Sequence, residues 1–219
     1  GSRGEPLVLT IARMEWIEPR TLDELLAHCA AHGAESLIVA GGTDAVPNLK
    51  HRLHEPRYVV HIARVHELHF IREEADGLAL GPLVTLTELA EDPRVRRDYP
   101  ALAKAAGLVA GPQLRNMGTL GGNLCNGSPA ADSVPALIAA AAVAALAGPQ
   151  GKRDLPVEDV MLGPRKLALR KGEIVVSFLL PPRPKRSSDA YLRFIPRTEM
   201  DIAVVGSGVS LTVDDAGTI

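Results

Sequence analysis

Two pairs of adjacent glycines constrain this chain more than any other feature. The first pair lies in residues 40–44 (AGGTD) and the second in residues 118–126 (GTLGGNLCN). Glycine has no Cβ atom and accepts positive φ, so the backbone N–H groups of such a segment can turn toward one anion. Two such segments predict two walls of one phosphate site. A long cofactor with a pyrophosphate group is the ligand that they suggest.

The composition argues against a nucleic-acid-binding protein. The chain has 219 residues, of which 46% are hydrophobic and 23% are charged, as in an ordinary globular protein with one large or two small domains. Aromatic residues make up only 3% and the net charge is −2. The chain therefore has neither the stacking platforms nor the basic surface that nucleic-acid binding requires.

No membrane span and no metal site are expected. The most apolar run, residues 136–147, is shorter than the ~20 residues that a membrane helix needs, and prolines and a glycine flank it. The amino end shows no apolar signal core, which favours the cytoplasm. Two cysteines far apart, Cys29 and Cys125, cannot supply the four ligands of an iron–sulfur cluster. The seven histidines show no metal-binding spacing.

The first third of the chain predicts a small parallel sheet. Thr21 and Glu24 predict a helix start, and this helix should end near Gly33. Residues 36–40 and 57–62 are short apolar runs typical of buried strands, and residues 46–52 fit a short helix or turn. The pattern differs from the Rossmann fingerprint, because it lacks the sequence G-x-G-x-x-G and no helix starts cleanly after the glycines.

The remainder predicts a larger mixed region followed by a separate unit. A hairpin is expected around residues 73–77, helices from Thr85 and over 100–109, and a strand over 174–180. A proline-rich linker, 181–184, then precedes a strand over 204–213 and a turn at 214–217. An isolated hairpin is barely stable, so we expect the start of an incomplete C-terminal domain here.

The chain resembles the FAD-binding subunit or domain of the molybdenum hydroxylases. The resemblance lies in residues 40–50 and 115–125, followed by Ser-Pro-x-x-Asp at 128–132 and Asp-Ile-Ala at 201–203. That family includes xanthine dehydrogenase and aerobic carbon monoxide dehydrogenase. The resemblance implies an α+β fold of the p-cresol methylhydroxylase and vanillyl-alcohol oxidase type, with FAD between two α/β subdomains. The expected units are a small subdomain over 14–65, a larger one over 66–182, and the start of a C-terminal domain over 188–219.

The resemblance also implies which residues bind FAD. The diphosphate and ribityl region would be wrapped by the first glycine segment, namely Ala40, Gly41, Gly42, Thr43, Asp44, Ala45, Val46 and Asn48. The second backbone wall would be Thr119, Leu120, Gly121, Gly122 and Asn123.

Three further positions are carried over from the family. Asp132 would accept hydrogen bonds near the adenosine portion, and Val175 would pack on the cofactor. Arg193 stands where relatives often have lysine near the isoalloxazine edge, where a cation offsets negative charge on the reduced cofactor. Simpler interpretations exist: Asp44 and Asp132 could cap helices, and Arg193 could be a solvated surface charge.

The implied function is electron transfer, with no catalytic residue assigned to this chain. The flavin would exchange electrons with two-iron clusters on a small subunit, while a large molybdopterin-binding subunit carries out the hydroxylation. NAD, oxygen or a quinone would be the terminal acceptor. Residues 126–129 (NGSP) replace the cysteine-rich insertion of the 4-hydroxybenzoyl-CoA reductase branch, so the chain looks closer to the carbon monoxide and xanthine dehydrogenase type. A free-standing flavin oxidase and a non-catalytic assembly module remain alternatives.

Overall fold

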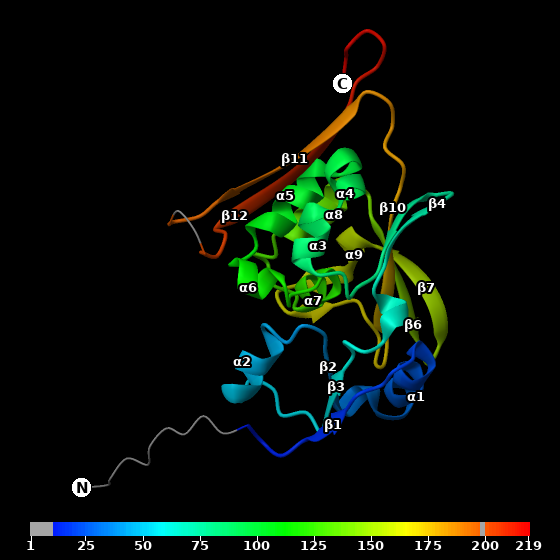
Figure 1. Ribbon diagram of the computed structural model, residues 1–219, viewed down its shortest axis with the longest axis vertical. Coiled ribbons are helices and arrows are strands. Elements are labelled where there is room, and N and C mark those ends of the chain that lie inside the picture. Colours follow the sequence, from blue (N-terminus) through cyan, green and yellow to red (C-terminus); the bar gives the residue numbers. More distant parts are fainter. Residues whose placement is uncertain (1–10, 198–199) are drawn as a thin grey trace, which may run out of the picture.

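The computed structural model describes residues 11–197 and 200–219 and contains two main sheets (Figure 1). The smaller sheet has three parallel strands, β1 (Glu15–Ile17), β2 (Ser36–Val39) and β3 (Tyr58–His61), in the order β1-β3-β2. Helix α1 (Leu22–His32) packs on one face and α2 (Ala45–Lys50) follows the first glycine segment. These elements lie within residues 14–65, the range predicted for a small subdomain.

Local chemistry explains where α1 begins and ends. The Thr21 hydroxyl oxygen accepts a hydrogen bond from the Glu24 amide at 3.2 Å, which satisfies one of the free N–H groups of the first turn. The helix ends at His32, directly before Gly33, as predicted. Leu25 and Cys29 on its buried face contact the core around Tyr58 and Val60.

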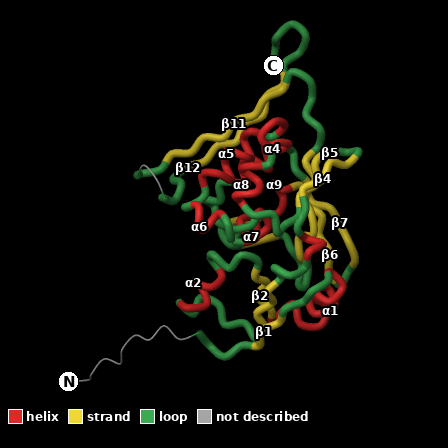
Figure 2. The backbone as a smooth tube through the Cα atoms, in the orientation of Figure 1, coloured by secondary structure: helices red, strands yellow, loops and turns green. Residues whose placement is uncertain are grey.

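The larger sheet has five antiparallel strands in the order β4-β5-β10-β6-β7. Their bounds are β4 (Ile71–Glu74), β5 (Gly77–Leu80), β6 (Val143–Gly148), β7 (Gly151–Pro156) and β10 (Ile174–Leu180). A layer of helices gathers on one side of this sheet (Figure 2). It is formed by α3 (Leu86–Glu91), α4 (Pro93–Asp98), α5 (Pro100–Leu108) and α8 (Ser133–Ala139). Side chains from both layers, including Leu80, Leu102, Leu137 and Phe178, form the main core.

Short elements complete the chain. They are η1 (Gly33–Glu35), η2 (His66–Leu68), α6 (Pro112–Arg115), α7 (Leu120–Cys125), α9 (Val157–Val160), β8 (Met161–Gly163) and β9 (Lys166–Leu167). The most apolar run, residues 136–147, is divided between α8 and β6 by a turn in which Ala141 has a φ of 53°. Within the described ranges, no helix is both long and apolar enough to cross a membrane.

The two subdomains touch directly. Ile174 of β10 belongs to the same hydrophobic cluster as Leu25 and Tyr58 of the small subdomain. A Cβ atom added at Gly33 would lie 2.5 Å from the Gly172 Cα atom, so the two backbones are in van der Waals contact. This contact fixes the position of the first glycine segment relative to the larger subdomain.

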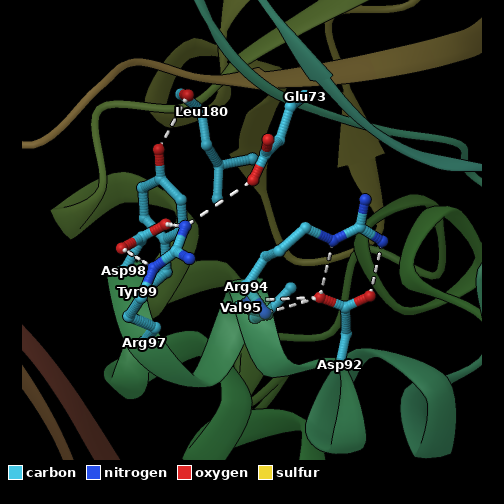
Figure 3. Close-up of polar contacts among 8 residues, drawn as sticks. All are labelled: Glu73, Asp92, Arg94, Val95, Arg97, Asp98, Tyr99 and Leu180. Carbon is cyan, nitrogen blue, oxygen red and sulfur yellow. Dashed lines mark hydrogen bonds and ion pairs between the residues drawn. The ribbon is translucent and has the colours of Figure 1, made fainter.

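Helix α4 fastens the helical layer to the end of β10 (Figure 3). The Tyr99 hydroxyl donates to the carbonyl oxygens of Leu180 at 2.9 Å and Pro181 at 2.7 Å. Arg97 pairs with its neighbour Asp98 at 2.6 Å and with Glu73 of β4 at 3.6 Å. The Tyr99 hydrogen bonds hold the end of β10 at the start of the proline-rich linker, residues 181–184, which has no regular secondary structure, as predicted.

After the linker, β11 (Ser187–Phe194) and β12 (Val205–Thr212) form an antiparallel ribbon packed on α5 and α8. In this ribbon the polar side chains of β11 face the protein interior and the apolar ones face outward. Its inward face carries the buried polar residues Asp189, Tyr191 and Arg193, whereas Leu192 and Phe194 on the outward face are 67% and 62% exposed. Strand β11 was not predicted, because this alternation places its apolar residues on the solvent side.

Candidate cofactor site

The first glycine segment leaves β2 at the carboxyl edge of the parallel sheet, where ligands bind in open α/β sheets. The backbone N–H groups of residues 41–45 donate to no acceptor within the described part of the chain. Gly42 has a φ of 72°, a conformation that glycine accepts readily. A run of unpaired amides of this kind can bind an anion such as a diphosphate.

The two glycine segments, distant in sequence, lie against each other. A Cβ atom added at Gly41 would lie 1.7 Å from the Met117 carbonyl oxygen, so only a glycine fits there. A Cβ atom added at Gly118 would lie 3.7 Å from the Thr43 hydroxyl oxygen, which is ordinary van der Waals contact. The structure thus brings together the two segments that the sequence assigned to one site.

The second segment is not a loop but the short helix α7, and its first amides are already paired. The Leu120 amide donates to the Val84 carbonyl and the Gly121 amide to the Pro82 carbonyl, both at 2.9 Å. The Gly122 amide donates to the Thr119 hydroxyl at 3.1 Å, and the Asn123 amide donates to the Thr119 carbonyl at 2.9 Å. These four amides therefore already have acceptors within the protein, and the contact of residues 119–123 with the cofactor stays a prediction. Gly121 is needed for close packing, since its Cβ would lie 2.6 Å from Pro82.

Asp132 does not cap helix α8, although it occupies the position before the first turn. Its carboxylate instead accepts hydrogen bonds from the Tyr191 hydroxyl at 2.7 Å and from the Arg193 guanidinium at 3.0 Å. The next residue, Ser133, donates to the side-chain oxygen of Asn123 at 2.6 Å. Helix α7, helix α8 and strand β11 are therefore joined by side-chain hydrogen bonds.

Arg193 is not a solvated surface charge, because its side chain is only 8% exposed. One terminal nitrogen binds Asp132, and no acceptor in the described ranges takes a hydrogen bond from its other N–H groups. The pairing also corrects a prediction. Asp132 and Arg193 were expected near the adenosine and the isoalloxazine of one extended FAD, yet their charged atoms lie 3.0 Å apart, so they cannot serve opposite ends.

The remaining predicted residues differ in setting. Asp44 stands at the start of α2, is exposed and makes no capping hydrogen bond, so the interpretation as a helix cap is wrong. Asn48 lies within α2, and its carbonyl oxygen accepts a hydrogen bond from the Leu53 amide. Val175 is 6% exposed and packs in the core of the larger subdomain, which leaves little of its surface for a cofactor.

Tyr191 is the residue of this neighbourhood that the sequence reasoning missed. Its hydroxyl is the second donor to Asp132, and its ring is 1% exposed. The spacing of Asp189, Tyr191 and Arg193 by two residues could have placed all three on one strand face. Among the described residues, no group of three histidine, cysteine or acidic side chains could hold a metal ion.

Comparisons with known proteins agree with this geometry. The family described as "FAD binding domain in molybdopterin dehydrogenase" matches residues 12–183. The xanthine dehydrogenase FAD-binding subunit of Escherichia coli O157:H7 is 37% identical over 187 residues, which are 84% of this chain and 64% of that protein. The nicotinate dehydrogenase FAD-subunit of Eubacterium barkeri is 35% identical and covers 93% of this chain and 70% of its own length.

A solved structure supports the α+β fold. Carbon monoxide dehydrogenase from Hydrogenophaga pseudoflava contains a chain that superposes with a TM-score of 0.88 at 32% sequence identity, over 92% of this chain and 70% of that chain. The present chain therefore spans about two thirds of the length of these relatives. The family match covers residues 12–183, and the unpaired amides of residues 41–45 lie within it. This chain belongs to the family of FAD-binding domains of molybdopterin dehydrogenases, whose cofactor is FAD.

Proposed function

We propose that this chain is the flavin-binding, electron-transferring part of a molybdenum-containing hydroxylase or dehydrogenase. It would pass electrons between iron–sulfur clusters of a partner subunit and a terminal acceptor. The observation that carries this proposal is the run of unpaired amides at residues 41–45 beside Met117, within a chain that matches an FAD-binding family. Relatives named as subunits of xanthine and nicotinate dehydrogenases favour this function over a free-standing oxidase or a non-catalytic module.

The residues present fit FAD at two places. The amides of residues 41–45 would hold the diphosphate, with the Thr43 hydroxyl as a further donor. The free N–H groups of Arg193 would face the isoalloxazine edge, and Asp132 would act there as the partner of Arg193 rather than at the ribose. Bound FAD supplies the capacity to exchange electrons singly or in pairs. The other predicted contacts, from Ala40, Val46, Asn48 and residues 119–123, remain predictions.

The assembly that we propose contains a large molybdopterin-binding subunit and a small subunit with two-iron clusters. The medium chain of carbon monoxide dehydrogenase from Hydrogenophaga pseudoflava, 33% identical over 197 residues, supports a place as the middle subunit. The terminal acceptor, whether NAD, oxygen or a quinone, stays a prediction. The location in the cytoplasm stays a prediction as well.

The ribbon β11–β12 supports the proposal that a C-terminal domain begins near residue 188. Its outward face exposes Leu192, Phe194, Val205, Val209 and Leu211 together. An apolar patch of adjoining strands is normally covered in a native protein. The family match ends at residue 183, within the linker, and this end is consistent with a domain boundary there.

Purification of the native complex tests the proposed function. We expect the chain to copurify with two other polypeptides and with flavin, iron and molybdenum, and substrate to reduce the flavin only when all three polypeptides are present. Substrate-dependent bleaching of flavin on the isolated chain would instead support a free-standing oxidase. An intact complex that turns over without any flavin would support an assembly role.

A further inference from the structure

Strand β11 is held to the helical layer by polar contacts rather than by an apolar face. Asp189 accepts a hydrogen bond from the Ala101 amide at 2.9 Å, and its other oxygen pairs with Arg183 at 2.5 Å. Two residues later, Tyr191 reaches Asp132, and after two more residues Arg193 reaches the same carboxylate. Hydrogen bonds of this kind require defined atoms to meet, so they fix the register of β11 against α5 and α8.

Tyr191 occupies a site that fits a tyrosine hydroxyl closely. Its side chain is 1% exposed, and a Cβ atom added at Gly206 of β12 would lie 2.6 Å from the hydroxyl oxygen. Burial, followed by the nearby Asp132 carboxylate, raises the pKa of the Tyr191 hydroxyl above its ordinary value. The hydroxyl therefore stays protonated and donates its proton in the hydrogen bond to Asp132.

This donor divides the Asp132 carboxylate between two partners. One oxygen accepts from Tyr191 and the other from Arg193, so Arg193 is bound through one nitrogen only. Without the hydroxyl, one buried oxygen would lack a protein donor, and the carboxylate could turn to bind the guanidinium through both oxygens. Such a bidentate pair would draw the free N–H groups of Arg193 toward Asp132.

We propose that Tyr191 is a positioning residue for the cofactor: by occupying one oxygen of Asp132, it keeps Arg193 bound through a single nitrogen and free to face FAD. This inference rests on the proposed function, because it concerns how strongly Arg193 acts on the cofactor. The hydroxyl dipole also offsets part of the negative charge of Asp132. Both effects leave more positive potential at the cofactor, which favours its reduced, electron-rich form.

The substitution Tyr191→Phe in the FAD-loaded protein tests this role. We expect the reduction potential of bound FAD, measured by equilibration with a reference dye, to become more negative, and FAD affinity to fall about tenfold. Tyr99→Phe is the matched control, since Tyr99 is also buried and hydrogen-bonded, but to backbone carbonyls of Leu180 and Pro181. A loss of thermal stability is expected in both variants, whereas a shift in potential is expected in Tyr191→Phe alone.

A double-mutant cycle with Asp132→Asn tests whether Tyr191 acts through Asp132. Asp132→Asn should make the reduction potential of bound FAD more positive, because Arg193 loses its counter-charge. Adding Tyr191→Phe to the Asp132→Asn variant should then change this reduction potential little. Gly206→Ala, which pushes on the hydroxyl from β12, supplies a second variant that keeps the tyrosine, and its potential should also become more negative.

The outcomes distinguish a failure of the proposed function from a failure of the positioning role of Tyr191. If the unaltered protein binds no FAD, the proposed function fails and this inference fails with it. If that protein binds FAD but Tyr191→Phe and Gly206→Ala leave the potential unchanged, only the positioning role is overturned. Equal shifts in Tyr191→Phe and Tyr99→Phe, or full additivity in the cycle, would also overturn it.

Discussion

Gly41 acts through the absence of a side chain, not through an unusual φ. A Cβ atom at this position would lie 1.7 Å from the Met117 carbonyl oxygen, and neither atom can turn away, because the backbone fixes the position of both. We expect Gly41→Ala to lower the free energy of unfolding by about 2 kcal/mol, as overpacked cores do. Urea unfolding measures this change.

The matched control is Gly107→Ala in α5, where the added Cβ would lie 3.7 Å from the Ala90 Cβ atom, an ordinary contact. This substitution should leave stability unchanged or raise it slightly, because alanine is the better helix former. Equal stability of Gly41→Ala and the unaltered protein would contradict the close approach of the two glycine segments.

The pair Asp132–Arg193 is buried at both ends, each side chain being 8% exposed. Arg193→Met should lower the free energy of unfolding by about 3 kcal/mol, because it leaves a buried carboxylate without its counter-charge. The control is Arg197→Met, since Arg197 pairs with Asp201 at the same 3.0 Å but is 76% exposed. Exposed pairs contribute little, so this control should unfold almost like the unaltered protein. Equal losses of unfolding free energy in the two variants would show that burial does not determine how much the Asp132–Arg193 pair contributes to stability.

At the scale of elements, Glu173 ties the start of β10 to β7. Its carboxylate accepts two hydrogen bonds from the Arg153 guanidinium, at 2.9 and 2.8 Å, and a third from the Arg170 amide. The Arg153 hydrogen bonds are the main cause that lowers the pKa of Glu173 below its usual 4.5. A carboxyl whose pKa is lowered by folding stabilises the native state above its unfolded pKa, and this contribution is lost as the pH falls through the folded pKa.

The free energy of unfolding should therefore decline below about pH 4.5, and the decline should be shallower in Glu173→Gln than in the unaltered protein. Urea unfolding at a series of pH values measures the slope. Glu158→Gln, at an exposed position of α9, should keep the original slope. An unchanged slope in Glu173→Gln would contradict the part assigned to this ion pair.

The elements that the sequence could predict are those with a complete local signal. Helix α1 has a side-chain cap and a glycine after its last residue, and β10 is a continuous apolar run. Strand β1 has only three residues, too few to show a period, and gains its pairing from β3. Helix α7 contains two glycines, which disfavour a helix, and it is stabilised by hydrogen bonds to Pro82 and Val84 in another part of the chain.

The same distinction applies to the candidate site. The two segments meet at Gly41 and Gly118, whereas Gly121 packs on Pro82, so glycines in the sequence indicate close backbone approach but not which partner is approached. Which amides are unpaired could not be predicted, since it depends on carbonyl groups that lie far away in sequence. The pairing of Asp132 with Arg193 likewise depends on how the ribbon packs on α8.

At the scale of the whole molecule, the ribbon β11–β12 presents an apolar face with no covering element in the described chain. If a C-terminal domain covers it in the full-length protein, Phe194→Ser should lower the free energy of unfolding by about 3 kcal/mol there, as for a buried aromatic residue. Ser188→Ala, on the same face, is the control and should change little. An unchanged stability of the full-length Phe194→Ser variant would contradict the proposed domain.

At the junction of the two sheets, we propose that the unpaired amides of residues 41–45, after β2, hold the diphosphate of FAD. An equilibrium titration of the apoprotein with FAD, followed by quenching of flavin fluorescence, tests it most directly. We expect saturable binding of one FAD per chain, weakened about tenfold or more by Gly41→Ala and unchanged by Gly107→Ala. Absence of saturable binding by the unaltered protein, or equal affinity in Gly41→Ala, would contradict it.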